Sequence, residues 1–178
     1  MKIIQAQAAN EIEAVRALFR EYQQFLGVDL CFQGFEQELA TLPGRYAPPQ
    51  GRLLLARDGE QAAGCVALRP LDEGVCEMKR LFVRPDYRGQ GLGRLLAVQG
   101  VDEATALGYV VMRLDTLETL DRAMRLYTEL GFQRRAPYYA NPLSGVAYWE
   151  RALSNRSPAS SVAEGSDHSP YDPVETPP

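Results

Sequence analysis

The stretch RPDYRGQGLGRLL, residues 84–96, places Gly89, Gly91 and Gly93 within five residues. It follows the run VCEMKRLFV, residues 75–83, whose apolar and β-branched side chains are typical of a strand. Directly after the glycines an apolar helical pattern begins, although glycine inside a helix is about 1 kcal/mol less favourable than alanine. Three glycines at this point therefore need a physical reason.

A strand, a glycine-rich turn and a helix in this order are typical of an anion-binding site. A helix N-terminus carries unpaired backbone N–H groups and the positive end of the helix dipole. Glycines let a phosphate reach these N–H groups and allow positive φ angles in the turn. Arg88 and Arg94 would add charge-assisted contacts. A tight turn that needs glycine for packing alone is the alternative, and the stretch matches neither a Walker loop nor a dinucleotide fingerprint.

Outward from this turn, hydrophobic periodicity predicts one domain over residues 1–153. The pair Asp58-Gly59 marks a hairpin turn, and Pro85 ends a strand. The predicted order is β-α-α-β-β-β-α-β-α-β-β, which indicates an α/β or α+β fold with mixed strand directions. Strands are predicted at residues 2–6, 52–70 (a hairpin), 75–85, 109–116, 132–139 and 145–153, and helices at 10–26, 35–42, 92–107 and 119–130.

Composition changes at Ser154, where SNRSPASSVAEGSDHSPYDPVETPP begins. Serine and proline dominate residues 154–178, apolar residues nearly vanish, and most of the charges are acidic. Such a segment cannot bury enough surface to order itself, so we predict a disordered tail. A passive extension and a segment that docks a partner are both compatible with this composition.

The remaining composition excludes several classes of function. The net charge of −4 falls largely on the tail, so the domain is nearly neutral and no nucleic-acid partner is expected. The only histidine, His168, lies in the tail, which leaves the domain without the histidine of a Ser-His-Asp triad. The three cysteines match no metal-ligand spacing, and no metal is expected. No apolar run reaches membrane-spanning length and the first residues resemble a strand rather than a signal peptide, so we expect a cytoplasmic protein without a membrane partner.

Two motifs carry a resemblance to a known family. EMKRLFVRPDYRGQGLGRLL, residues 77–96, and RLDTLETLDRAMRLYTELGFQ, residues 113–133, resemble the GNAT N-acetyltransferase superfamily. Residues 88–93, RGQGLG, match that family's [QR]-x-x-G-x-[GA] acetyl-CoA signature in every fixed place, and AMRLYTELGF matches its second signature. The resemblance covers residues 1–153 and implies a mixed, mostly antiparallel sheet flanked by helices.

The resemblance implies acetyl-CoA as cosubstrate. The backbone of β-strand residues near Leu81 would pair with the pantetheine arm, and the N–H groups of the glycine turn would hold the pyrophosphate. One position departs from the family: a cofactor-contacting asparagine is replaced by Leu120, so that contact is either lost or supplied elsewhere, with Asp121 as a candidate. The implied cofactor-binding residues are Leu81, Phe82, Val83, Arg88, Gly89, Gln90, Gly91, Leu92, Gly93 and Arg94.

Direct acyl transfer needs a neutral amine, a polarised thioester carbonyl and a proton for the departing thiolate, but no enzyme nucleophile. The resemblance places Tyr127 beside the thioester sulfur as the acid and Glu77 at a general-base position. Each has a structural alternative. Tyr127 falls in the apolar stripe of its helix, and Glu77 could pair with a cation such as Lys79, Arg80 or Arg113 without any chemical role.

The sequence indicates the identity of the acceptor least clearly. The resemblance implies an acceptor site with Tyr22 from the first helix and Tyr138 and Tyr139 before the turn-rich ANPLSG, residues 140–145. We expect an N-acetyltransferase that acts in a ternary complex on a small amine, an amino acid or a peptide. A non-catalytic CoA-binding sensor or interaction module is the alternative, and a homodimer is compatible with the sequence.

Overall fold

The computed structural model describes residues 1–154, except for the side chain of Phe32. The predicted tail, apart from Ser154, lies outside these residues. The helices are α1 (Ala9–Leu26), α2 (Phe35–Thr41), α3 (Leu92–Ala106) and α4 (Asp121–Glu129), with short 3₁₀ turns η1 (Cys31–Gln33), η2 (Gly44–Tyr46) and η3 (Pro85–Tyr87). The strands are β1 (Lys2–Gln5), β2 (Arg52–Asp58), β3 (Gln61–Asp72), β4 (Val75–Val83), β5 (Val111–Leu117), β6 (Gln133–Arg135) and β7 (Val146–Ala152).

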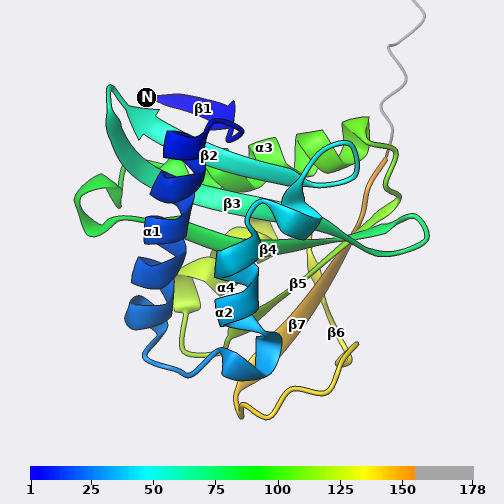
Figure 1. Cartoon of the computed structure of the whole chain (residues 1–178). Coiled ribbons are helices and arrows are strands. Elements are labelled where there is room, and N and C mark those ends of the chain that lie inside the picture. Colours follow the sequence, from blue (N-terminus) through cyan, green and yellow to red (C-terminus); the bar gives the residue numbers. More distant parts are fainter. Residues whose placement is uncertain (155–178) are drawn as a thin grey trace, which may run out of the picture.

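The strands form one sheet in the order β1-β2-β3-β4-β5-β7-β6 (Figure 1). Every neighbouring pair is antiparallel except β4 and β5, which run parallel. The predicted fold class is therefore confirmed. No helix within residues 1–154 is long and apolar enough to cross a membrane.

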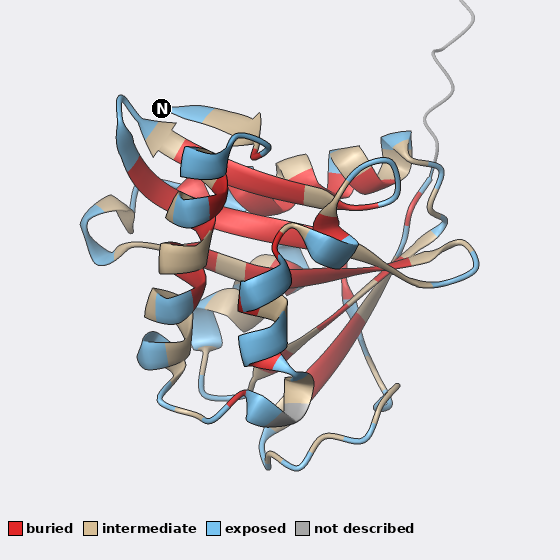
Figure 2. Cartoon of the chain, in the orientation of Figure 1, coloured by how far each residue is buried: buried red, intermediate tan, exposed pale blue. Residues whose placement is uncertain are grey.

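Helices cover both faces of the sheet, so the central strands are buried on both sides (Figure 2). Because strand side chains alternate between faces, Leu53 and Leu55 pack toward α1 and α2, whereas Leu54 and Ala56 pack toward α3 and α4. This double coverage explains why LLLA in β2 is continuously apolar rather than alternating.

The parallel pair β4–β5 separates soon after it forms. Only Val75–Glu77 of β4 pair with β5, and the register of β4 against β3 then shifts by one residue at a bulge. The bulge contains Arg80, whose φ of 58° makes it the one described non-glycine residue with positive φ. Such a residue costs about 1–3 kcal/mol and persists only when its surroundings fix it. The bulge bends β4 away from β5 and opens the middle of the sheet.

Several predicted elements differ from the structure by one or two residues at their ends, and one predicted strand is much shorter. The strand predicted at 132–139 forms only over Gln133–Arg135, because Pro137 lacks the N–H that a ladder needs. Tyr138 and Tyr139 consequently lie in the loop before β7. The last helix begins at Asp121 instead of residue 119, since Leu120 has a non-helical ψ of 65°.

Candidate active site

The opening between β4 and β5 continues into a cleft of about 530 Å³, within the usual size of a small-molecule site. One wall is the free edge of β4 after it leaves β5. The opposite wall is the start of α4, and the glycine turn before α3 forms the end. The residues lining the cleft include Leu81, Phe82, Val83, Arg88, Gly89, Gly91, Leu92, Gly93, Leu120 and Asp121.

The glycine turn has the geometry that an anion site needs. Gly89 and Gly91 have φ angles of 78° and 80°, which other residues rarely adopt. A Cβ at either position would meet no atom within 4 Å, so packing does not explain them. Gly91 is the N-cap of α3 and supplies no side-chain cap. Within residues 1–154, the amides from Gly89 to Arg94 have no hydrogen-bond acceptor, so their donors are available to a ligand.

Gly93 differs from the other two glycines. Its φ is not in the positive range, and a Cβ there would only touch the side chain of Val83 at 3.8 Å. Neither backbone strain nor crowding within the described chain therefore requires glycine at this position, although it lines the cleft. Close approach of a ligand to the first turn of α3 is the remaining physical reason.

The two arginines that flank the glycines point to different places. Arg88 lines the cleft, donates from Nε to the carbonyl of Val83 at 2.8 Å and lies 4.4 Å from the ring centre of Phe25. Arg94 instead pairs with Glu129 at 2.7 Å on the surface and does not line the cleft. The side chain of Gln90 also lies outside the cleft, so its contribution is limited to the backbone amide.

A smaller chamber of about 80 Å³ adjoins the cleft, and the two share Tyr22, Leu81, Leu120 and Ala123. Tyr127 lines this chamber and packs its ring against Phe132 at 5.8 Å. Its hydroxyl has no hydrogen-bond partner within the described part of the chain. Burial raises the pKa of Tyr127 above the ordinary value of 10.0, which keeps the phenol protonated.

Glu77 does not face the chamber. Its side chain is 1% exposed and pairs with Arg69 at 2.7 Å, while its other oxygen accepts from the hydroxyl of Tyr138 at 2.8 Å. Lys79 lies 3.7 Å from the same carboxylate. Of the three partners weighed from the sequence, only Lys79 is in contact, and Arg69 was missed because it comes from the neighbouring β3. A carboxylate this deeply buried is stable only when it is paired and hydrogen-bonded.

The pair Arg69–Glu77 belongs to a row of alternating charges across the sheet. Glu77 stands opposite Arg69 on β3 and Arg113 on β5, and Arg113 stands opposite Glu150 on β7. Arg113 and Arg135 both bond the carboxylate of Glu150. Glu77 is thus one member of a structural charge row.

One functional candidate was missed from the sequence. Asp115 lines the chamber, accepts from Lys79 Nζ at 3.0 Å through Oδ1, and accepts from the hydroxyl of Tyr139 at 3.0 Å through Oδ2. A signal was present: Asp115 stands two residues after Arg113 in a buried strand, on the same face of the sheet, and a charge there needs a purpose.

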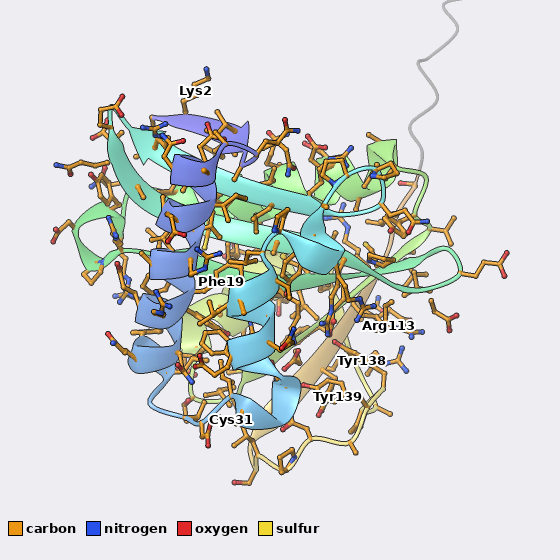
Figure 3. The ribbon with its side chains drawn as sticks, in the orientation of Figure 1. Lys2, Phe19, Cys31, Arg113, Tyr138 and Tyr139 are labelled. Carbon is orange, nitrogen blue, oxygen red and sulfur yellow. The ribbon has the colours of Figure 1, made fainter. Side chains whose placement is uncertain are left out.

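The three tyrosines expected near the acceptor occupy two places. Tyr22 lines both the chamber and the cleft, and burial raises its pKa to about 12. Tyr138 and Tyr139 pack with Tyr148 in edge contacts of 5.4–5.6 Å, and Tyr138 lies beside Arg113 (Figure 3). Burial, together with the charges of Glu77 and Asp115, raises the pKa of both loop tyrosines. They line a side cavity of about 240 Å³ rather than the cleft.

The residues described in the structure include no group of three or more His, Cys, Asp or Glu side chains that could hold a metal ion.

Comparison with known proteins defines the class. The model of the acetyltransferase (GNAT) family matches residues 12–132. The chain belongs to this family, which confirms the resemblance seen in the sequence. An uncharacterized N-acetyltransferase of Schizosaccharomyces pombe is 45% identical over 147 residues, covering 82% of this chain and 90% of the relative. An IAA acetyltransferase of Azospirillum brasilense is 35% identical, covering 74% and 87%.

Solved structures share the fold at low identity. An acetyltransferase from Streptococcus agalactiae superposes with a TM-score of 0.73 at 21% identity, covering 85% of this chain and 98% of that one. A Salmonella typhimurium chain solved with its cofactor acetyl-CoA gives a TM-score of 0.66 at 20% identity, covering 90% and 98%. An aminoglycoside 6'-N-acetyltransferase complexed with coenzyme A gives a TM-score of 0.67 at 15% identity, and the match covers 89% of this chain and 100% of that one.

Proposed function

We propose that the chain transfers an acetyl group from acetyl-CoA to a primary amine of a small molecule, amino acid or peptide. The transfer is direct, within a ternary complex, and residues 1–153 form the active domain. One observation carries the proposal: the cleft that ends at the free amides of α3 adjoins the chamber lined by Tyr127, and the two share the lining residues Tyr22, Leu81, Leu120 and Ala123. The groups that we propose to bind the pyrophosphate and to donate the proton therefore belong to adjoining parts of one site.

The donor set of the cleft fits acetyl-CoA. Consecutive unpaired amides at a helix N-terminus suit a pyrophosphate, which brings negative charge to the positive end of the dipole. The free edge of β4 at Leu81 to Val83 suits the amide groups of a pantetheine arm, in the manner of an added strand. The carboxylate of Asp121 at the opposite wall replaces the family's asparagine contact beside Leu120.

The chemical step needs a proton at the sulfur. The amine nitrogen attacks the carbonyl carbon and the carbon–sulfur bond breaks. The nitrogen gives up one proton to water, the thiolate takes one from the enzyme, and water reprotonates the enzyme donor. In our proposal Tyr127 donates that proton, since its hydroxyl is uncommitted within the described residues and burial raises its pKa. In our proposal Glu77 acts on the reaction only through the residues that it holds in place. Its carboxylate is bonded to Arg69 and Tyr138 and does not line the chamber.

A specific observation also favours a second candidate, a CoA-binding sensor without catalysis. Leu120 replaces a cofactor contact, and Glu77 is fully engaged in an ion pair. The two functions differ in one measurement. Release of the CoA thiol from acetyl-CoA is followed for the full chain across alkylamines, amino acids, amino-acid amides and a short peptide, with products checked by mass. Amine-dependent release supports the enzyme, whereas tight acetyl-CoA binding without amine-dependent release supports the sensor.

A further inference from the structure

The chamber offers one carboxylate to an acceptor, and it belongs to Asp115. Within the described lining of the chamber, Asp115 is the single acidic residue, and its side chain is 12% exposed. Glu77 is 1% exposed and lines the side cavity instead. The carboxylate that meets an incoming amine is therefore on β5, although the sequence directed attention to β4.

Strand register explains the difference. Glu77 is the last residue of β4 that pairs with β5, opposite Arg113. Asp115 lies two residues beyond Arg113, past the last pair of β4 with β5 and next to the bulge that contains Arg80. Glu77 and Asp115 therefore lie on the same face of the sheet. Glu77 lies where β4 and β5 are paired, and Asp115 lies where they are no longer paired.

The hydrogen bonds of Asp115 leave room for a ligand. Each of its oxygens accepts one bond, from Lys79 and from the hydroxyl of Tyr139. A carboxylate has about four acceptor positions, so each oxygen keeps one for an amine N–H.

A second acceptor adjoins Asp115. The single proton of Tyr139 goes to Asp115, so the amide nitrogens of Asn141 and Gln33, at 2.9 and 3.4 Å, act as donors to the same hydroxyl. The oxygen of the Gln33 amide is left buried with no partner, although Gln33 lines the chamber. A buried acceptor without a donor is costly, and a bound N–H group in the chamber would supply the missing donor.

The cations of the chamber are already paired. Lys79 bonds Asp115 and approaches Glu77, and Arg80 donates two bonds to Glu38. An acceptor that carries a carboxylate beside its nitrogen would therefore add a negative charge to a chamber whose two cations are already matched by Asp115 and Glu38.

We propose that Asp115, assisted by the amide oxygen of Gln33, binds the amine of the acceptor, and that the chamber selects amines without a carboxylate next to the nitrogen. This inference rests on the proposed function and narrows its acceptor class. Tyr139 is a positioning residue in this arrangement, because its hydroxyl holds both acceptors.

The test compares 2-aminoethanol with glycine, two amines of similar size and basicity that differ in the carboxylate. Acetylation by the full chain is measured as kcat/KM for each. We expect 2-aminoethanol to be preferred by about tenfold or more, since like charges placed together at a binding site are strongly unfavourable. The Asp115→Asn variant should raise the KM for 2-aminoethanol and bring the ratio toward one. Asp102→Asn, the same change at an exposed site on α3, is the matched control and should leave the ratio unchanged.

The outcomes are distinguishable. Equal use of the two amines, a preference for glycine, or an unchanged ratio in Asp115→Asn overturns the inference and leaves the proposed function intact. The wild-type comparison decides this even if Asp115→Asn does not fold. Acetylation of other amines but of neither probe likewise overturns the inference alone. If no amine in any assay is acetylated, the proposed function fails and the inference fails with it.

Discussion

The guanidinium of Arg80 donates two hydrogen bonds to the carboxylate of Glu38, at 3.1 Å from Nε and 2.7 Å from Nη2. Arg80 is the bulge residue with a φ of 58°, so an ion pair from α2 holds the conformation that separates β4 from β5. The side chains are only 3% and 12% exposed. Opening of the active site thus depends on Glu38, a residue of α2 that lines neither the chamber nor the cleft.

The first prediction concerns this pair. Glu38→Gln leaves a buried guanidinium without its counter-charge and should lower the free energy of unfolding by about 3 kcal/mol. Denaturant unfolding measures the change. Arg80→Gly in the same background should restore part of the stability, because glycine adopts positive φ without strain and removes the unpaired charge. A loss below about 1 kcal/mol, the range of an exposed pair, would show that Arg80 needs no partner.

The second prediction is the pH dependence of stability. Burial raises the pKa of Glu38, but the hydrogen bonds and charge of Arg80 outweigh it, and the net pKa lies below 4.5. The folded protein therefore binds fewer protons than the unfolded chain, so this contribution is present above pH 4.5 and is lost as the pH falls below it. Unfolding free energies measured down through this range should fall more steeply in the wild type than in Glu38→Gln. Parallel curves would contradict the linkage.

The third prediction separates anion binding from folding at the glycine turn. Gly93→Ala places a Cβ against the cleft at an ordinary φ, so the protein should keep or gain stability, by up to about 1 kcal/mol. Calorimetry should nevertheless show CoA affinity reduced by roughly tenfold, equivalent to about 1.4 kcal/mol. Gln90→Ala is the matched control, since its side chain lies outside the cleft. Unchanged CoA affinity in a folded Gly93→Ala variant would remove the ligand as the reason for this glycine.

The fourth prediction concerns the tail. Truncation after Leu153 should leave the melting temperature and acetyl-CoA turnover close to those of the full chain, because the Ser/Pro-rich segment offers almost no apolar surface to dock. Thermal unfolding and thiol release on both proteins check this. A fall of many degrees would show that these residues belong to the domain.

Local patterns made much of the fold predictable. The helix after Gly91 and the hairpin at Asp58-Gly59 depend on residues close in sequence, and both form where the sequence predicts them. The loop tyrosines Tyr138 and Tyr139 did not follow an extended pattern, because the prolines around them outweigh the β-propensity of tyrosine.

The site was predictable only in part, because its polar contacts cross between strands. Glu77 pairs with Arg69 through the register of β3 and β4, and no local pattern fixes a register that contains a bulge. Asp115 reaches the chamber because β4 bends at Arg80, a conformation that the sequence of β4 does not announce. The anion-binding role of the glycine turn was predicted from backbone groups of adjacent residues, so that prediction did not require the strand register.

If Tyr127 gives the proton to the departing thiolate, kcat with acetyl-CoA and a substrate amine must fall in the Tyr127→Phe variant. Loss of a general acid should lower kcat by about 10²-fold or more. The KM for acetyl-CoA and the melting temperature should change little, because the hydroxyl has no partner within the described residues. In the wild type, the raised pKa of Tyr127 predicts no loss of rate from phenol ionisation up to pH 10.0. Full kcat in a folded Tyr127→Phe variant across this pH range would contradict the account and return Tyr127 to a packing role in α4.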